Sequence, residues 1–595
     1  MQDRSRSPAI HFGTSFSKHL IRIWNLRITY PSQDIFLWDD DVSGAYRIPK
    51  YNPAVAGAFA YAIMSYFFLP TGGTFGSNTS PAEYEPLARA RAFLASHLSR
   101  DTSLVTTHAK ILDLVEFEVE KNPSSVQYTQ AIADDIHKGV FDPSQGRDVN
   151  TPHHPFVDDT LMADIRRHMP TAMAASIEAL FLILGRDDLP NCRYNINMDK
   201  FAVSKCSWIK EQLGLIINTR SMMVFLPEVK RLRMLDLLSG TWHVHRKSFT
   251  LLEGVTLLGN LEHAASVSPW ARHLYCALRS AANHCLRSSM SDMTKFPQLA
   301  TMAAEVREAK TPEETELFDR FFKAKISKSL YKSKKPCFIS KELSLELSFL
   351  RHIMAQPTLY KWESPIAHMV PRSPDFTSLG DSCLYAAGGF SLDLQFWWYI
   401  HWPEEIQQKT LKYYTIKSWD YTADKFVSIN LLEYAAIIIN YAAATHVLST
   451  RGPNPRNPFP VLLNLADNMT ANCWTQKTAT SNLAGRGLAR LFCALRLNNS
   501  LGLNSEFLAG LLNIIADAIS RVRSPRGSAP DFTQLMQDYP ELNSCLRFHP
   551  SAELLSCLMQ GLLSKLGPGV QVPKTLGHLT QDNATTPPTS SQPSN

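Results

Sequence analysis

The stretch Phe156-Val157-Asp158-Asp159-Thr160-Leu161 places two adjacent carboxylates between apolar residues. Turn-forming residues, Thr151-Pro152 and Pro155, precede it, and this pattern predicts a tight β-hairpin that carries both acids at its tip. Two like charges on one turn repel each other unless cations lie beside them, and hard divalent metals prefer carboxylate oxygens. An ordinary solvated turn also contains such pairs, so the meaning of this one depends on a third carboxylate.

Asp41 is that third carboxylate, and it lies far upstream. The apolar run Ile35-Phe36-Leu37-Trp38 predicts a buried strand that ends in Asp39-Asp40-Asp41. We expect Asp41 to leave the strand end as a metal ligand, with Asp39 and Asp40 solvated. Asp41 also begins the pattern Asp-x-x-x-Ala-Tyr-x-x-Ile-Pro, which contains Tyr46. The alternative is an acidic strand end followed by an ordinary loop.

A glycine-rich turn separates these two acidic motifs. Leu69-Pro70-Thr71-Gly72-Gly73-Thr74-Phe75-Gly76 is followed by Ser80-Pro81-Ala82-Glu83, a capping box with proline at the first helical position. The sequence therefore predicts a helix after residue 80, kinked in its first turns by Pro86. Glycines in the turn allow backbone to approach a ligand closely.

These three motifs, in this order, resemble the palm of retroelement reverse transcriptases, and the resemblance covers residues 20–265 with a helical thumb from about Glu253 to Leu261. It implies an RNA-directed DNA polymerase whose catalytic, metal-binding acids are Asp41, Asp158 and Asp159. Two Mg²⁺ ions, replaceable by Mn²⁺, would lie about 3.5–4 Å apart in such a site. The segment from Trp208 to Ile217 resembles the turn that grips the primer. The resemblance implies substrate-contacting roles for Tyr46, Phe75, Gly76 and Gly214.

Four further acids are spaced along the C-terminal half. Asp381 lies on a predicted strand before a small-residue hairpin, and Glu433 lies in an apolar helix, where a residue at the helix rim is the alternative. Asp467 follows the buried strand Val461-Leu462-Leu463-Asn464-Leu465, and Asp517 lies in the pattern Asn-x-x-Ala-Asp-x-x-Ser-Arg. This order resembles retroelement ribonuclease H and implies a catalytic quartet on two metal ions that cuts RNA in RNA–DNA hybrids. The histidine that relatives often carry before the glycine of the last motif is absent before Gly510.

The fold class that follows is a multidomain α+β or α/β protein. The expected partners are an RNA template, a DNA primer, RNA–DNA hybrid and deoxynucleoside triphosphates. The predicted divisions are a reverse transcriptase palm with partial fingers over 1–225 and an insertion that loops out at 99–150, a thumb-like helical region over 226–325, a connection over 326–370, a ribonuclease H-like domain over 371–540, a helical segment over 541–569 and a disordered tail over 570–595.

Two alternatives remain open for the function. The first motif begins only about forty residues into the chain, so most of the expected fingers region is missing. The chain is then either an active polymerase and nuclease or a truncated retroelement remnant that binds nucleic acid without polymerising. A helical protein with chance motifs is a third reading. With no integrase zinc pattern and no aspartic-protease motif, the layout looks most like retroelements mobilised by a tyrosine recombinase.

Composition limits the remaining possibilities. The 595 residues are 45% hydrophobic and 19% charged, which is typical of globular domains, and the net charge is +6. Ten scattered cysteines favour a reducing compartment with thiols as small core residues. We see no run of 18 apolar residues and no signal peptide, so we expect an intracellular protein, in the cytoplasm or nucleus, without a membrane partner. One basic cluster could bind along the phosphates of a nucleic acid. It is formed by Lys323, Lys325, Lys328, Lys332, Lys334 and Lys335.

Overall fold

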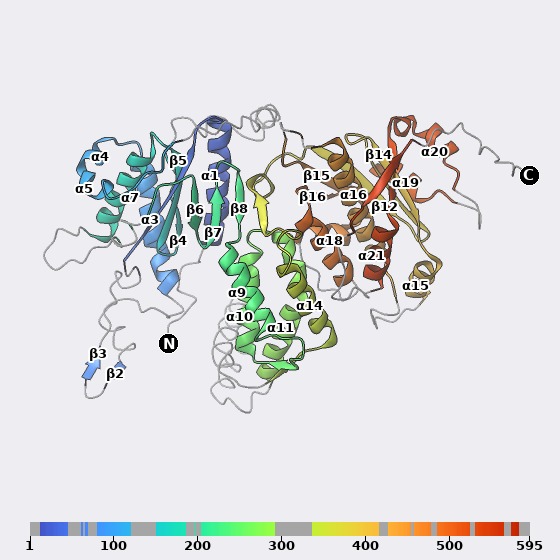
Figure 1. The fold of residues 1–595 in the computed structure, drawn as a ribbon, viewed down its shortest axis with the longest axis horizontal. Coiled ribbons are helices and arrows are strands. Elements are labelled where there is room, and N and C mark those ends of the chain that lie inside the picture. The colour runs from blue at the N-terminus through green and yellow to red at the C-terminus, as the bar shows by residue number, and fades with distance from the viewer. Residues whose placement is uncertain are drawn as a thin grey trace, which may run out of the picture. The chain divides into compact units, whose positions relative to one another are not determined.

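The computed structural model describes residues 12–43, 45, 61–63, 66–68, 80–120, 150–185, 196, 201, 204–291, 336–415, 426–452, 454, 457–477, 485–523, 530–563 and 573–581. The chain forms two compact units (Figure 1). The first unit comprises Met1–Pro227, Thr301–Ala324 and Ser364–Arg372. The second unit comprises Glu228–Ala300, Lys325–Glu363 and Ser373–Asn595. Tyr46, Phe75, Gly76 and the lysine cluster at 323–335 lie outside the described residues.

The first unit is built on a three-stranded antiparallel sheet, ordered β1-β5-β4, and a four-stranded sheet, ordered β11-β8-β7-β6. Helices α3 and α7 pack together over the three-stranded sheet, and α1 packs against β4 and β5. Their shared core includes Phe36, Trp38, Met162 and Met173, all of them fully buried. The elements are α1 (Ser15–Thr29), β1 (Ile35–Asp41), β2 (Tyr61–Ile63), β3 (Tyr66–Phe68), α3 (Ser80–Leu98), α4 (Ser103–Thr107), α5 (Ala109–Leu112), β4 (His154–Phe156), β5 (Asp159–Ile165), α7 (Met169–Leu184), β6 (Ile209–Gln212), β7 (Leu215–Asn218), β8 (Met223–Phe225) and β11 (Glu363–Pro365).

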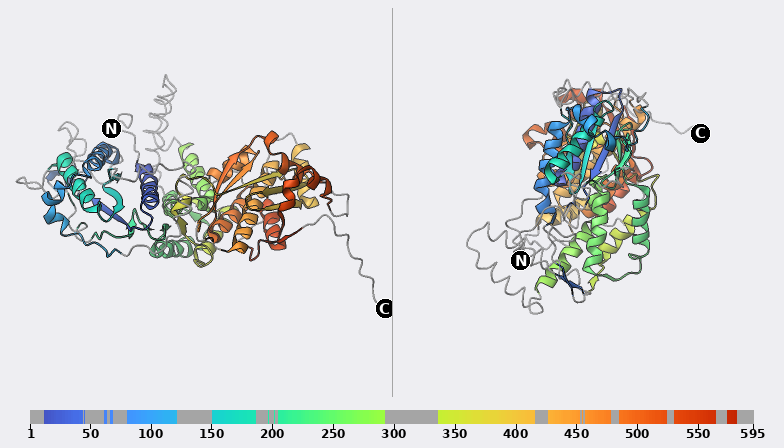
Figure 2. Two further views of the ribbon diagram at one scale, coloured as in Figure 1. Left: turned by 90° about the horizontal axis from the view of Figure 1, so that it is seen from above. Right: turned by 90° about the vertical axis from the view of Figure 1, so that its left-hand side faces the viewer.

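A seven-stranded mixed sheet, ordered β16-β15-β12-β13-β14-β17-β18, forms the core of the second unit. Helix α16 packs on β12 and β13, and so does α19 (Figures 1 and 2). The neighbouring glycines of β13 show that these helices cover opposite faces, because a Cβ on Gly389 would meet Asn440 of α16 and one on Gly388 would meet Ile519 of α19. The sheet is therefore buried on both faces.

The second unit also contains a helical region, in which α9, α10, α11 and α14 pack on one another. The elements of the second unit are α9 (Glu228–Ser239), β9 (Ser248–Phe249), α10 (Leu251–Ala264), α11 (Cys276–Ser291), β10 (Cys337–Phe338), α14 (Lys341–Met354), β12 (Phe376–Ser382), β13 (Ala386–Ser391), β14 (Phe396–His401), α15 (Glu404–Thr415), α16 (Ile429–Arg451), β15 (Val461–Ala466), α17 (Met469–Lys477), α18 (Arg486–Asn498), β16 (Gly502–Phe507), α19 (Ile514–Ser520), α20 (Thr533–Asp538), β17 (Leu546–Pro550), α21 (Ala552–Leu562) and β18 (Gly577–Thr580).

The predicted segment boundaries differ from the structure in three places. Within the insertion expected to loop out at 99–150, the described part forms α4 and α5, and Leu104 packs on Ala174 and Ala175 of α7. The pairing of β9 with β10 crosses the boundary expected near residue 326. The seven-stranded sheet continues past residue 540. β17, inside the expected helical segment, pairs with β14, and β18, inside the expected tail, pairs with β17.

Two expectations drawn from composition also differ from the structure. Cys285 and Cys337 form a disulfide, although we expected only free thiols. Helix α16 is long and apolar enough to cross a membrane by length and composition, although we expected no such segment. However, 89% of its apolar window is buried inside the unit, as in a core helix of a globular domain.

Candidate functional site

The β1–β5 ladder brings Asp41 and Asp159 together, since they are paired residues on adjacent antiparallel strands. The amide of Val42 donates a 3.3 Å hydrogen bond to the carbonyl of Asp158. As a result, one carboxylate oxygen from each of Asp41, Asp158 and Asp159 lies within 4.8 Å of the other two. All three side chains are half-buried. This first cluster therefore has the spacing that shared divalent metal ions require.

The predicted hairpin is confirmed as the element that carries two of these acids. Phe156 pairs with Asp159, so Val157 and Asp158 form a two-residue turn between β4 and β5. Val157 adopts a φ of 59°, a left-handed conformation that a β-branched residue rarely takes. Such a conformation costs on the order of 1–3 kcal/mol and is typical of functional turns.

Asp40, which we expected to be solvated, is instead buried beneath the first cluster. It forms an ion pair with Arg91 of α3, and the Ser176 hydroxyl of α7 donates a 2.6 Å hydrogen bond to it. Arg91 also donates to the Thr160 hydroxyl at 3.2 Å. Because Asp40 precedes Asp41, these contacts fix the backbone of the strand end that carries the metal ligand candidate.

The β6–β7 hairpin, which carries Gly214, is fastened to the same strand. Gln212 donates to the carbonyl of Trp38 at 3.1 Å, and the Lys210 ammonium lies 3.3 Å from Asp39. Burial raises the pKa of Asp39, and Lys210 opposes that shift. Gly214 lies in the turn with a φ of 73°, which glycine adopts freely. The hairpin expected to contact a primer is thus held next to the first cluster.

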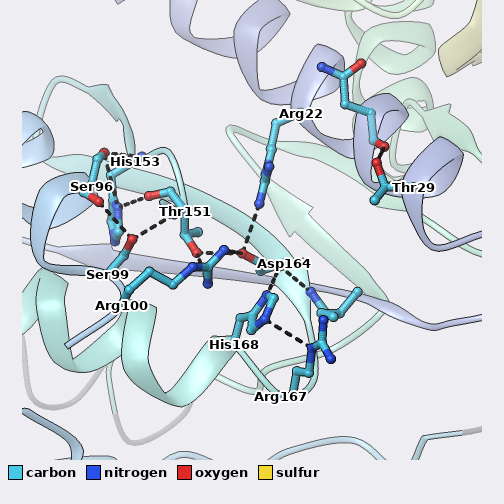
Figure 3. Close-up of polar contacts among 12 residues, drawn as sticks. Arg22, Thr29, Ser96, Ser99, Arg100, Thr151, His153, Asp164, Arg167 and His168 are labelled. Atoms are coloured by element: carbon cyan, nitrogen blue, oxygen red, sulfur yellow. Dashed lines mark hydrogen bonds and ion pairs between the residues drawn. The ribbon is translucent and has the colours of Figure 1, made fainter. Parts of the chain in front are cut away.

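Asp164, farther along β5, organises a separate polar cluster that the sequence did not reveal (Figure 3). Its carboxylate lies 3.0 Å from Arg22 of α1 and 3.1 Å from His168, and Thr151 donates to it at 2.5 Å. Burial raises the pKa of Asp164, but the hydrogen bond from His168 and the charge of Arg22 outweigh it and hold the pKa at about 2. This ionised carboxylate joins α1 to the sheet.

A second carboxylate cluster lies in the second unit. Asp381 comes from β12, Glu433 from α16, and Asp467 directly follows β15. One oxygen of each of these three carboxylates lies within 4.8 Å of the other two. Asp381 and Glu433 are buried, so Glu433 is not the residue at the helix rim that the alternative reading suggested. β12 and β15 pair in parallel, which brings their carboxyl ends to the same edge of the sheet.

A buried polar network holds α16 close to this sheet. The Trp398 indole donates to Asn440 at 2.7 Å, and Asn440 donates to Asn464 of β15 at 2.8 Å. A Cβ on Gly380 would lie 2.7 Å from the Asn440 amide nitrogen, so glycine is needed for this approach. Since Glu433 lies two turns before Asn440 on the same helix, the network sets the depth at which Glu433 enters the cluster.

The motif around Asp517 supports Asp381 through its flanking residues. Asn513 donates to the carbonyl of Gly380 at 3.1 Å, and the Ser520 hydroxyl donates to Asp381 at 2.5 Å. Asp517 forms an ion pair with Arg521 at 2.6 Å. It is not among the three acids within 4.8 Å of one another, but its charge acts on Asp381, Glu433 and Asp467.

The electrostatics of the second cluster favour a bound cation. Burial, with the charges of Asp467 and Asp517, raises the pKa of Asp381 to about 6. Burial and Asp381 raise the pKa of Glu433 well above its ordinary value, and burial and Asp517 raise that of Asp467. Glu433 Oε2 is buried and has no hydrogen-bond partner among the described residues. Divalent metal would relieve this repulsion and satisfy that oxygen, so the residues present fit such a group.

Comparison with known proteins gives weak similarities. No family model and no curated protein matches the chain. Among solved structures, the foamy viral protease-reverse transcriptase in complex with RNA/DNA hybrid is 10% identical, with a TM-score of 0.28, over 86% of this chain and 48% of that one. The dRH form in complex with double-stranded DNA is 10% identical, with a TM-score of 0.28, over 80% of this chain and 57% of that one. The complex of the protease-reverse transcriptase with double-stranded DNA is 10% identical, with a TM-score of 0.26, over 79% of this chain and 67% of that one. The chain spans about half the length of the first two proteins.

Proposed function

We propose that this chain is a nucleic-acid enzyme with two metal-dependent sites, a reverse transcriptase site in the first unit and a ribonuclease H site in the second. The observation that carries the proposal is the convergence of two separate sets of three carboxylates. Each set joins residues that are distant in sequence. Each also coincides with a motif set whose order in the sequence resembles that of retroelement polymerases and nucleases.

In the polymerase site, Asp41, Asp158 and Asp159 would hold two Mg²⁺ ions. Such ions supply Lewis-acid stabilisation to the attacking and leaving oxygens of phosphoryl transfer. The chain's own residues contribute by positioning the three acids and the hairpin beside them. The Arg91–Asp40 ion pair fixes one strand end, the Val157–Asp158 turn presents the other acids, and the β6–β7 hairpin is held beside them. Deoxynucleoside triphosphates, a DNA primer and an RNA template are the substrates proposed for this site.

In the nuclease site, Asp381, Glu433 and Asp467 would hold the metals, with Asp517 as an additional ligand. The proposed substrate is the RNA strand of an RNA–DNA hybrid. The support is that β12, the β13–β14 hairpin, α16, β15 and α19 follow one another in this order, with α15, α17, α18 and β16 between them, and the resemblance implies such an order for the nuclease fold. The site lacks the histidine expected before Gly510, and we expect this to lower turnover without removing activity, since the metals provide the main charge stabilisation.

Primer extension on a primed RNA template tests the polymerase assignment. With Mg²⁺ or Mn²⁺, the full chain should extend the primer only weakly, and Asp158→Asn should abolish that extension while leaving template binding intact. Asp467→Asn is the matched control, because it makes the same change in the other unit and should extend like the wild type. Template binding without extension by the wild type would favour the alternative, a retroelement remnant that binds nucleic acid but does not polymerise.

A further inference from the structure

A pocket of about 210 Å³ lies in the first unit between the start of α1, the middle of α3 and the edge strand β4. It is separate from the carboxylate cluster, since none of Asp41, Asp158 and Asp159 lines it. Its wall includes Ser15, whose hydroxyl donates to the carbonyl of Pro155 at 2.5 Å and fastens α1 to β4. The residues that line it are Thr14, Ser15, Lys18, Glu85, Arg89, Ala92, Phe93, Ser96, His153, His154 and Pro155.

The pocket is lined by exposed cations and by an exposed aromatic ring. Lys18 and Arg89 are both exposed cations, and Glu85 is the one acid that lines the pocket, so one net positive charge remains. The first turn of α1, which contains Lys18, holds no acidic residue, so the positive end of its helix dipole is not neutralised there. Phe93 is one turn after Arg89 on α3, and 76% of its surface is exposed. An exposed phenyl ring beside cations is suited to a base that stacks next to its own phosphate.

Two of the lining residues are histidines, His153 and His154, and they differ in their contacts. The His153 ring nitrogens lie 2.9 Å from the carbonyl oxygen of Thr151 and 3.1 Å from that of Ala172, and the His153 amide donates to the Ser96 hydroxyl at 2.9 Å (Figure 3). His154 is only 9% exposed, yet its Nε2 has no hydrogen-bond partner among the described residues. A buried unpaired ring nitrogen costs about 1–3 kcal/mol and calls for a missing partner. Burial lowers the pKa of His154 well below its ordinary range, so this ring is neutral at physiological pH.

We propose that this pocket binds a nucleotide, with the phosphate between Lys18 and Arg89 and the base on Phe93. Phosphate contacts by lysine and arginine provide most of the affinity of such sites, and stacking on an aromatic ring tolerates any base. The nucleotide is either free or part of a single strand, because both carry the same phosphate and base. The site needs no metal ion, which distinguishes it from the two carboxylate clusters.

Calorimetric titration of the full chain in EDTA tests this proposal, because chelation removes metal-dependent binding at the two carboxylate clusters. The pocket variants then separate binding in this pocket from nucleic-acid binding elsewhere on the chain. The probes are AMP, inorganic phosphate and a short single-stranded oligodeoxyadenylate. Lys18→Ala and Arg89→Ala should each weaken AMP binding by about tenfold. Phe93→Ala should weaken AMP binding and leave phosphate binding unchanged. Lys110→Ala and Leu182→Ala are matched controls, since both residues are exposed on the same unit and lie outside the pocket.

The outcomes distinguish a single strand from a free nucleotide as the ligand, and they also include results that would overturn the proposal. Tighter binding of the oligonucleotide than of AMP, lost in the pocket variants, supports a strand as the ligand. Equal binding of both supports a free nucleotide. The proposal is overturned if wild type binds none of the probes, or if AMP binds to Lys18→Ala and Phe93→Ala as it binds to the wild type. Phosphate binding as tight as AMP binding would also overturn it, because Phe93 would then contribute nothing.

Discussion

The Ser520 hydroxyl donates a 2.5 Å hydrogen bond to Asp381 Oδ2, although 139 residues separate the two in sequence. This bond favours the ionised carboxylate and opposes the rise that burial imposes on the pKa of Asp381. Ser520 is fully buried at the end of α19, so the last motif of the chain controls the charge of an acid on the first strand of the sheet.

Ser520→Ala should therefore raise the pKa of Asp381 further above about 6. Because a metal ligand must be deprotonated, metal affinity at neutral pH should fall by about tenfold or more. The acid limb of the pH–rate profile for hybrid cleavage should move to higher pH. Ser544→Ala, an exposed serine in the same unit, is the control. An acid limb that stays in place in Ser520→Ala would show that this hydrogen bond does not set the charge of Asp381.

Asp381→Asn should stabilise the metal-free protein at neutral pH. The folded pKa of Asp381 is raised from 3.8 to about 6, so the folded state holds the proton more tightly than the unfolded state does. Stability conferred by the protonated form is therefore lost as pH rises from about 4 to 6, and the loss amounts to about 3 kcal/mol at most. In EDTA near pH 7, the thermal midpoint of Asp381→Asn should exceed that of wild type. Mg²⁺ should raise the midpoint of wild type more than that of Asp381→Asn, which keeps only the first-unit carboxylate cluster intact. An equal rise in both would refute the metal assignment of the cluster at Asp381, Glu433 and Asp467.

Gly389→Ala should destabilise the second unit. A Cβ at this position would lie 2.6 Å from Asn440 Oδ1 and 2.7 Å from the carbonyl of Leu379, and overpacking of this kind costs about 1–3 kcal/mol. Gly259→Ala on α10 is the matched control, since a Cβ there meets nothing within 4 Å and alanine favours helix by about 1 kcal/mol. Thermal denaturation should thus shift in opposite directions for the two variants. A stable Gly389→Ala protein would mean that α16 is not packed on β13 as described.

Arg91→Leu should destabilise the first unit by about 3–5 kcal/mol, because it leaves the buried Asp40 carboxylate without its ion-pair partner. The double variant Arg91→Leu with Asp40→Asn should recover part of that loss, since no charge then remains buried. Lys110→Ala, an exposed cation of the same unit, should change stability by less than about 0.5 kcal/mol. Chemical denaturation measures all three. Equal stability of Arg91→Leu and Lys110→Ala would contradict the burial of this pair.

The strands and acids of both clusters could be predicted because their signals are local. The run of residues 35–38, the hairpin around Asp158 and the strand at residues 461–465 each combine apolar residues with an acidic or turn-forming end. Residues 15–29 gave no such signal, although they form α1. Its buried face includes Arg22, which pairs with Asp164, and Arg27, which donates to the carbonyls of Pro31 and Thr219. Buried arginines break an apolar pattern, so long-range partners decide this helix.

The same limit explains the other differences between sequence and structure. Asp40 could not be told from Asp39 and Asp41 until Arg91 and Ser176 were placed beside it. The β17 strand pairs with β14, about 150 residues earlier, and a pattern within residues 541–566 does not contain that information. Tyr46, Phe75 and Gly76 lie outside the described residues, so their roles stay predictions.

Cleavage of a labelled RNA–DNA hybrid tests the central claim of a metal-dependent nucleic-acid enzyme most directly. The full chain should cut the RNA strand with Mg²⁺ or Mn²⁺ and should not cut it in EDTA. Asp467→Asn removes a proposed metal ligand while keeping the shape of the side chain, so it should abolish cutting and retain hybrid binding. Asp158→Asn, the equivalent change in the first unit, should cut like wild type. Equal cleavage by wild type and Asp467→Asn, or none by wild type, would contradict the assignment of the carboxylate cluster at Asp381, Glu433 and Asp467.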